Sequence, residues 1–213
     1  MSLLKNSNLE EFAAELASNS ATPGGGSAAA LSGALGAALV SMVCRLTIGK
    51  KGYEDYFAEL EEVLGLAEDL RSKLIEAVDV DAGAYGKVMN AFRLPKDTED
   101  QKKDRTAAIQ SAFKEACESP RRTSLWSLDV LRLCARIASK VNVNAASDLG
   151  VGATQALAGL EGACMNVLIN LPSIKDEEYV ELLKREVEET EEEGRILKSG
   201  VMREVLGYIG GAS

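Results

Sequence analysis

The chain has 213 residues, of which 46% are hydrophobic and only 5% aromatic, and its formal net charge is −9. This length is sufficient for a domain with a buried core, and a chain so acidic is a poor binder of nucleic acid, whose phosphates require a basic surface. The sequence contains no histidine, which excludes histidine-ligated metal sites and Ser-His or Cys-His catalytic pairs, so proton transfer must use carboxylates, lysine, tyrosine, cysteine or water.

The first half of the chain predicts three helices. Asn8 and Glu11 form a capping pair that opens a short helix through about Ala17. After the loop TPGGGS, a second helix of mostly small residues is expected over 27–48. Apolar residues then recur every three or four positions over 53–94 without a proline, which predicts one long amphipathic helix.

The second half predicts further helices. Thr98 begins a capping box for a helix to about Ser119, and the Ser-Pro pair that follows predicts a separate helix over 120–141. After the connector NVNAASD, Ser147 or Asp148 would cap a helix that runs to Leu171. The acidic segment 176–193 belongs to a last helix, which closes the chain.

These elements predict an all-α fold, a single-domain helical bundle of six or seven helices over residues 1–213. Segments 24–44 and 149–174 are rich in small residues and nearly free of charge. Each is long enough to span a membrane, but the first opens with a glycine loop instead of basic or aromatic anchors. We therefore expect two inner helices packed against each other, and no membrane.

The four cysteines have no paired C-x-x-C spacing. They are Cys44, Cys117, Cys134 and Cys164, all within apolar, helix-like stretches, and no signal peptide is recognisable. Such cysteines are typical of reduced core thiols, so we expect a cytoplasmic protein.

The loop TPGGGS at the start of the first inner helix has two interpretations. Free N–H groups and the positive end of the helix dipole would suit an anion or the polar edge of a ligand. No G-K-[ST] follows and no strand precedes, so the loop is neither a Walker loop nor a dinucleotide fingerprint. The alternative is a tight turn in which glycine only permits a positive φ.

The segment VDVDAGAY contains the leading acid–base candidate. Asp81 lies three residues after Val78 and four before Tyr85, on the apolar stripe of the long helix. Asp79 is about a quarter turn away and should be more exposed. A carboxylate on a buried stripe is costly unless it is paired or used, and its pKa should rise. We expect Asp81 to be a general acid or base; the alternative is a structural carboxylate bonded to a neighbouring helix.

Polar residues near two helix ends offer further candidates. Asn142, Ser147 and Asp148 stand at a helix entrance, where such residues ordinarily form loops and caps. Asn166 and Asn170 are four residues apart, so they share one face of an apolar helix. Two amides there require partners from the protein or from a ligand.

Most basic residues are expected to be solvated surface charges. Lys50 and Lys51 end the first inner helix, where cations also suit the helix dipole. Of the basic residues, this pair has the best chance of meeting an anionic ligand.

The ordered motifs TPGGGSAAA, GKKGYED, VDVDAGAY…AFRLPK, AASD and NVLINL resemble those of formiminotetrahydrofolate cyclodeaminases, including the cyclodeaminase part of formiminotransferase-cyclodeaminase. The resemblance covers nearly the whole chain, and its specificity lies in the ordered set. It implies an all-helical homodimer with a cleft for a tetrahydrofolate, polyglutamylated or not, and no metal or redox cofactor. A formiminotransferase portion is not recognisable, so we expect a stand-alone protein.

The resemblance implies conversion of 5-formimino-tetrahydrofolate to 5,10-methenyl-tetrahydrofolate and ammonia. The same family includes methenyl-tetrahydrofolate cyclohydrolases, which open that ring with water, and the sequence does not separate the two activities. A non-catalytic folate-binding protein that kept only the fold is the third possibility.

The resemblance places the catalytic aspartate in VDVDAGAY, where the apolar stripe favours Asp81. The substrate-binding candidates are Gly24, Gly25, Gly26, Ser27, Lys50, Lys51, Tyr85, Asn142, Ser147, Asp148 and Asn166. Lys50 and Lys51 would hold the glutamate tail of the folate. Glu161 departs from expectation, because a neutral residue is expected in the middle of an inner helix. If buried, it would be an extra acid–base group or the partner of a base from the other subunit.

Overall fold

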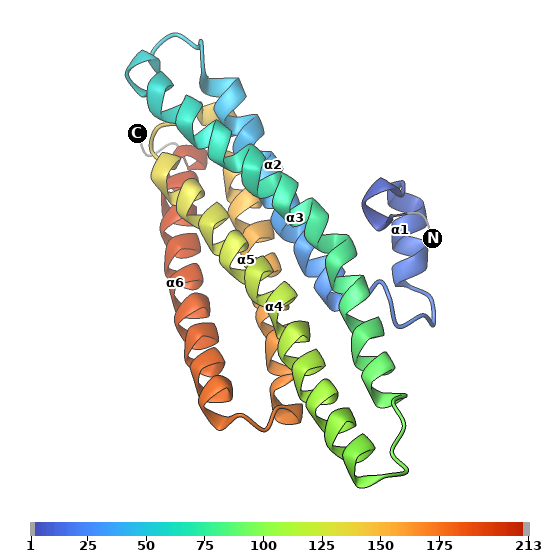
Figure 1. Cartoon of the computed structure of the whole chain (residues 1–213). Helices are drawn as coiled ribbons and strands as arrows, with labels where there is room; N and C mark the ends of the chain where they lie inside the picture. Colours follow the sequence, from blue (N-terminus) through green and yellow to red (C-terminus); the bar gives the residue numbers. More distant parts are fainter. Residues whose placement is uncertain (1–2, 211–213) are drawn as a thin grey trace.

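The computed structural model describes residues 3–210, apart from the side chains at 82, 84 and 85. Within these residues the chain forms six α-helices and no strand, which confirms the predicted all-α bundle (Figure 1). The helices are α1 (Leu9–Leu16), α2 (Gly25–Thr47), α3 (Phe57–Phe92), α4 (Glu99–Ile137), α5 (Ala146–Leu168) and α6 (Glu177–Ile209).

Helices α2 to α5 form the bundle around which the other helices are arranged. α2 packs on α3 and α5, and α4 packs on α3 and α5, while α6 lies along α4 and α5. In Figure 1, α3 and α4 lie in front of α2 and α5, and the short α1 stands to the side of α3. The long amphipathic helix and the acidic C-terminal helix are therefore confirmed as α3 and α6.

The two predicted inner helices are α2 and α5, and their small residues allow the backbones to approach closely. A Cβ on Gly159 of α5 would lie 2.7 Å from the backbone nitrogen of Gly33 in α2. A Cβ on Gly36 would lie 2.9 Å from the carbonyl oxygen of Gly152. α2 meets the length and composition of a membrane-spanning helix, but 61% of its most apolar window is buried inside the bundle.

Helix α4 differs from the prediction, because one helix replaces the two expected on either side of Pro120. Proline has no N–H, so the usual hydrogen bond to the Ala116 carbonyl cannot form, at a cost of about 3 kcal/mol. Pro120 is buried against its neighbours, and packing along the whole of α4 holds the helix continuous.

The predicted caps are only partly correct. Asn8 with Glu11 and Thr98 with Gln101 form complete capping boxes. α5, however, begins at Ala146 with Ala145 as its N-cap, so Ser147 and Asp148 lie within its first turn and do not cap it.

All four cysteines are free and buried, as predicted. Burial raises the pKa of Cys44 and Cys117 to about 11. It raises the pKa of Cys134 and Cys164 to about 12. These thiols are therefore protonated core residues at neutral pH.

Candidate active site

A pocket of about 440 Å³ lies where the start of α2, the second half of α3, the middle of α4 and the end of α5 meet. Residues of the TPGGGS loop at the start of α2, here called the glycine turn, form one wall. The polar side chains Asp81, Asn166 and Asn170 border the same space. The apolar walls come from Val88, Met89 and Phe92 of α3, from Phe113 and Pro120 of α4, and from Ile169.

Asp81 lies directly against the glycine turn. A Cβ on Gly26 would approach the Asp81 carboxylate closer than the 3.0 Å that real side chains respect. The Ser27 hydroxyl donates to the Val78 carbonyl at 2.9 Å and lies 3.4 Å from Oδ2 of Asp81. The positive-φ glycines in the described residues are Gly49 and Gly52, so the glycines of the turn serve close approach, and the interpretation through a positive φ is wrong.

The surroundings of Asp81 suit acid–base chemistry. Burial raises the pKa of its carboxyl group, while the hydroxyl and the amide of Ser27 act in the opposite direction. The start of α2 points its positive dipole end at this region, which also favours the charged form. Among the described residues that line the pocket, Asp81 is the sole charged one.

Asp79 occupies a different environment. Its Oδ1 accepts a hydrogen bond from the Leu4 amide at 2.6 Å. It borders a second pocket, of about 400 Å³, between α3 and α4. Asp79 and Asp81 are both half-buried, so exposure does not distinguish them. The two aspartates differ in what they face, and Asp81 alone meets the glycine turn.

Two amides at the end of α5 complete the polar side of the pocket. Asn166 donates from Nδ2 to the Gly162 carbonyl at 2.8 Å. A Cβ on Gly25 would lie 3.4 Å from that same nitrogen, so Asn166 faces the glycine turn. Asn170 donates to the Asn166 carbonyl at 2.8 Å. The Oδ1 atoms accept no hydrogen bond from the described residues and are available to a ligand.

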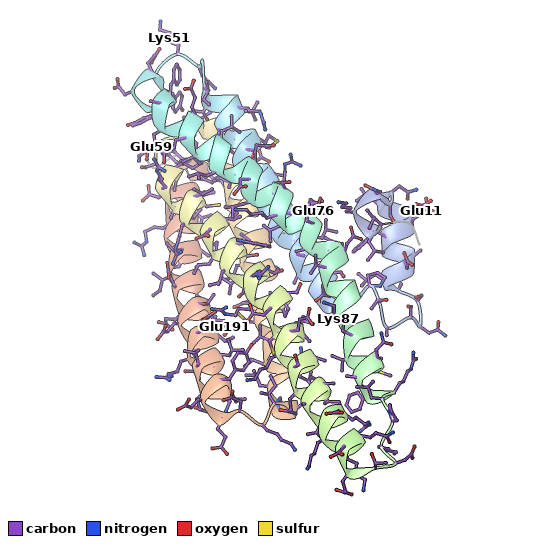
Figure 2. All side chains as sticks on the ribbon, in the orientation of Figure 1. Glu11, Lys51, Glu59, Glu76, Lys87 and Glu191 are labelled. Carbon is purple, nitrogen blue, oxygen red and sulfur yellow. The ribbon has the colours of Figure 1, made fainter. Side chains whose placement is uncertain are left out.

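The remaining candidates lie at the other end of the bundle. They are Lys50, Lys51, Asn142, Ser147 and Asp148, which follow the end of α2 or precede and open α5. Lys50 donates to Oδ1 of Asn142 at 2.7 Å. α2 separates this end from the glycine turn by about 33 Å, at 1.5 Å per residue. Figure 2 shows Lys51 at one tip, far from Lys87 on the pocket-lining part of α3. Within one chain these five residues do not line the pocket, which corrects the prediction of a single cleft.

Two further candidates have separate outcomes. The side chain of Tyr85 lies outside the described residues. Glu161 is half-buried and accepts a hydrogen bond from Nε of Arg195 in α6 at 3.0 Å. It therefore pairs with a base of its own chain, and the suggested partnership with another subunit stays a prediction.

The apolar walls of the pocket were not predicted from the sequence, although the helical spacing of some of their residues could have indicated them. Val88 and Phe92 follow Asp81 by seven and eleven residues, which places them on the same helix face. Phe113 belongs to α4 and joins them only through the antiparallel packing of α3 and α4. Helical spacing could have found the first two, but not the third.

The fold and the pocket define an all-helical protein with one half-buried carboxylate beside a glycine-lined cavity. The family model described as formiminotransferase-cyclodeaminase matches residues 8–189, and the chain belongs to this family.

The chain is 42% identical over 199 residues to the methenyltetrahydrofolate cyclohydrolase of Methylorubrum extorquens, covering 93% of each chain. It is 38% identical to the formimidoyltransferase-cyclodeaminase of Sus scrofa over 80% of this chain, and it spans 32% of the pig protein's length. Among solved structures, the formiminotetrahydrofolate cyclodeaminase of Thermotoga maritima superimposes with a TM-score of 0.87 at 32% identity. That match covers 97% of this chain and 99% of the other.

Proposed function

We propose that the protein is a folate one-carbon enzyme that acts at the carbon joining N5 and N10 of tetrahydrofolate. The observation that carries this proposal is Asp81, the single charged group in a largely apolar pocket at the glycine-lined start of α2. Relatives that cover nearly the whole chain act, by name, on the methenyl and formimino forms of this cofactor.

The charge of the pocket is complementary to the bridged folate. In 5,10-methenyl-tetrahydrofolate a positive charge is shared by N5, the bridging carbon and N10. A carboxylate attracts such a cation more strongly in an apolar pocket than in water. The flat pterin ring would lie against Phe92 and Phe113, whose rings contact each other edge to face with centroids 6.1 Å apart. The amide oxygens of Asn166 and Asn170 would accept hydrogen bonds from its polar edge.

Ring opening requires one group that first takes and then returns a proton. The Asp81 carboxylate takes a proton from water while the water oxygen bonds to the bridging carbon. The protonated carboxyl group then gives this proton to a ring nitrogen as the C–N bond breaks. The regenerated carboxylate takes the proton of the added hydroxyl group and passes it to solvent, which leaves a formyl group. A raised pKa makes the return of the proton easier.

The deaminase reaction uses the same group in the opposite order. N10 attacks the formimino carbon, and protonated Asp81 gives its proton to the departing ammonia. The resulting carboxylate accepts the proton from N10. Holding the substrate bent, with N10 close to the formimino carbon, contributes much of the acceleration.

We propose the cyclohydrolase as the principal activity, because the relative of that name matches at 42% identity over 93% of both chains. The cyclodeaminase, which the sequence motifs had placed first, is the second candidate. The similarity to the Thermotoga structure over the full length of both chains favours it.

Three further properties belong to this proposal. The enzyme works as a cytoplasmic homodimer on tetrahydrofolates with one or more glutamates. The proton transfers described need only protein groups, so no resident metal or redox cofactor is assigned. Four free buried thiols support a reducing compartment.

A spectroscopic assay tests the function. Purified protein is mixed with 5,10-methenyl-tetrahydrofolate, and the near-ultraviolet absorbance of the methenyl form is followed against the spontaneous decay. A catalysed fall that Asp81→Asn abolishes supports the cyclohydrolase. A catalysed rise from 5-formimino-tetrahydrofolate supports the cyclodeaminase. Tight folate binding without turnover in either assay would indicate a binding protein and contradict the enzymatic proposal.

A further inference from the structure

Ser27 contacts Asp81 but does not line the pocket. Its side chain is fully buried, at 0% exposure. The residues that border the pocket include Gly26 and Asp81 but not Ser27. A ligand in the pocket therefore meets the carboxyl group of Asp81 and does not meet the hydroxyl group of Ser27. Any effect of this hydroxyl group on the reaction must act through Asp81.

The Ser27 hydroxyl group has two acceptors within reach and only one proton. Its Oγ lies 2.9 Å from the Val78 carbonyl oxygen and 3.4 Å from Oδ2 of Asp81. Both acceptors belong to α3, in which Val78 precedes Asp81 by three residues. A hydroxyl group donates one hydrogen bond and has two acceptor lone pairs. While it donates to Val78, its lone pairs are therefore free to accept from Asp81.

The charge of Asp81 decides which of the two acceptors is the better one. An ionised carboxylate only accepts, and its hydrogen bonds are stronger than those of a neutral carbonyl group. A protonated carboxyl group is itself a donor. The Ser27 hydroxyl group then donates to Val78 and accepts from Asp81. Ser27 thus keeps a hydrogen bond to Asp81 in both charge states.

We propose that Ser27 is a positioning residue whose hydroxyl group turns between Asp81 and Val78 as Asp81 loses and gains the catalytic proton. It donates to the carboxylate when Asp81 is charged and accepts from the carboxyl group when Asp81 is neutral. No proton passes between the two side chains, because only the O–H bond of Ser27 rotates. The proposal deepens the function above and rests on it for the reaction in which Asp81 changes charge.

A group that takes and returns a proton in one turnover must be stabilised in both charge states. Burial favours the neutral form of Asp81, whereas the Ser27 amide is a fixed donor that favours the charged form. A hydroxyl group that can turn stabilises the charged form and still leaves a hydrogen bond for the neutral form. The carboxyl group can therefore both accept and return the proton readily.

The alternative is a structural role, in which the hydroxyl group bonds only Val78 and joins α2 to α3. Such a bond does not depend on the charge of Asp81. The two roles therefore differ in their dependence on pH and on the residue at position 81.

A thermal-melting cycle tests the coupling without reference to activity. Wild type, Ser27→Ala, Asp81→Asn and the double variant are melted from acid to neutral pH. The Ser27 hydroxyl group lowers the pKa of Asp81, so its removal raises the folded pKa further. The loss of melting temperature in Ser27→Ala should therefore be smallest below the unfolded pKa of aspartate. It should grow by a few degrees as the pH rises through the folded pKa.

In the Asp81→Asn background, Ser27→Ala should lower the melting temperature equally at every pH, because no charge change remains at position 81. A loss that is independent of pH in both backgrounds would show a purely structural bond to Val78 and would overturn the proposal.

Ser127→Ala is the matched control. Ser127 is also 0% exposed, and its Oγ has no hydrogen-bond partner among the described residues. It belongs to α4 and does not border the pocket. Its removal should change neither the pH dependence of melting nor turnover. A pH-dependent loss as large as that of Ser27→Ala would mean that any buried hydroxyl group has this effect, contrary to the assignment of Ser27.

A pH–rate profile tests the consequence for catalysis. With 5,10-methenyl-tetrahydrofolate, kcat/KM requires ionised Asp81 in the free enzyme. In Ser27→Ala the acid limb of the profile should move to higher pH. On that limb kcat/KM should fall about 10-fold, as expected for the loss of one hydrogen bond to a charged group. The difference should narrow at higher pH.

A kcat/KM that Ser27→Ala lowers equally at every pH would overturn the positioning role. If the wild type shows no turnover with either folate, the proposed function fails. The melting cycle would still decide whether Ser27 responds to the charge of Asp81.

Discussion

Gly26 of α2 and Asp81 of α3 are packed so closely that no side chain fits between them. A Cβ on Gly26 would fall within 3.0 Å of the Asp81 carboxylate atoms. This contact joins two motifs that are 55 residues apart in sequence. It explains the glycines at the start of α2 by what they must approach.

Gly26→Ala should therefore displace the carboxylate and reduce activity. A shift of about 1 Å at the reacting group can lower the rate about 100-fold, and overpacking should cost about 1–3 kcal/mol of stability. Turnover and thermal melting would measure the two effects. Gly65→Ala in α3 is the control, because nothing lies within 4 Å of its added carbon. It should leave turnover unchanged, and an unaffected Gly26→Ala variant would contradict the tight contact.

Asp81→Asn should remove most of the catalytic rate while preserving the shape of the pocket. Loss of a general acid–base group typically lowers kcat by about 10²- to 10⁴-fold. Asp79→Asn provides the matched control two residues away, since an asparagine oxygen can still accept the Leu4 hydrogen bond. Comparison of kcat for both variants tests the assignment. Equal losses of kcat in the two variants would show that contact with the glycine turn does not distinguish Asp81 as the acid–base group.

Asp81→Asn should also be more stable than the wild type at neutral pH. Burial raises the pKa of Asp81, so the folded state binds this proton more tightly than the unfolded state. The resulting stabilisation is complete below the unfolded pKa and is lost as the pH rises through the folded pKa. Asp81→Asn avoids that loss, so its melting temperature should exceed that of the wild type by a few degrees at pH 7 and converge with it in acid. A difference that does not change with pH would indicate altered packing.

Helix periodicity and capping boxes were sufficient to predict the order and type of the elements. Apolar spacing defines α3, and Thr98 with Gln101 defines the start of α4. The local signal at Pro120 failed, because burial along α4 outweighs the missing hydrogen bond. Tertiary packing of this kind is not visible in a short window of sequence.

The site was partly predictable for a related reason. Asp81 followed from its place on the apolar stripe, and Asn166 from its place on an apolar helix. The sequence did not show which helix ends meet, because Gly25 begins α2 whereas Lys50 follows the opposite end of this helix. Only the antiparallel pairing of α2 and α5 shows that Asn166 joins Gly25 while Asn142 joins Lys50.

The close packing of α2 on α5 predicts a stability defect in Gly159→Ala. The added carbon would lie 2.7 Å from the Gly33 nitrogen and 2.8 Å from the Ala29 carbonyl oxygen. These are backbone atoms that cannot rotate away, so urea unfolding should show a loss of about 1–3 kcal/mol. Gly200→Ala in α6 meets nothing within 4 Å and should gain about 0.5–1 kcal/mol. A neutral Gly159→Ala would mean that the two helices are farther apart in solution.

Pro120→Ala should separate stability from ligand binding. Alanine restores the N–H that can bond the Ala116 carbonyl, and its helix propensity is about 3 kcal/mol more favourable than that of proline. Pro120 and Ala116 both line the pocket, so the substitution removes the proline ring from the pocket wall. The restored N–H also bonds the Ala116 carbonyl, which is then no longer free to accept from a ligand. We expect a higher melting temperature together with a higher KM. Ser111→Ala, at an exposed position of the same helix, should raise stability slightly and leave KM unchanged. An unchanged KM in Pro120→Ala would show that neither the ring nor the free carbonyl contacts the substrate.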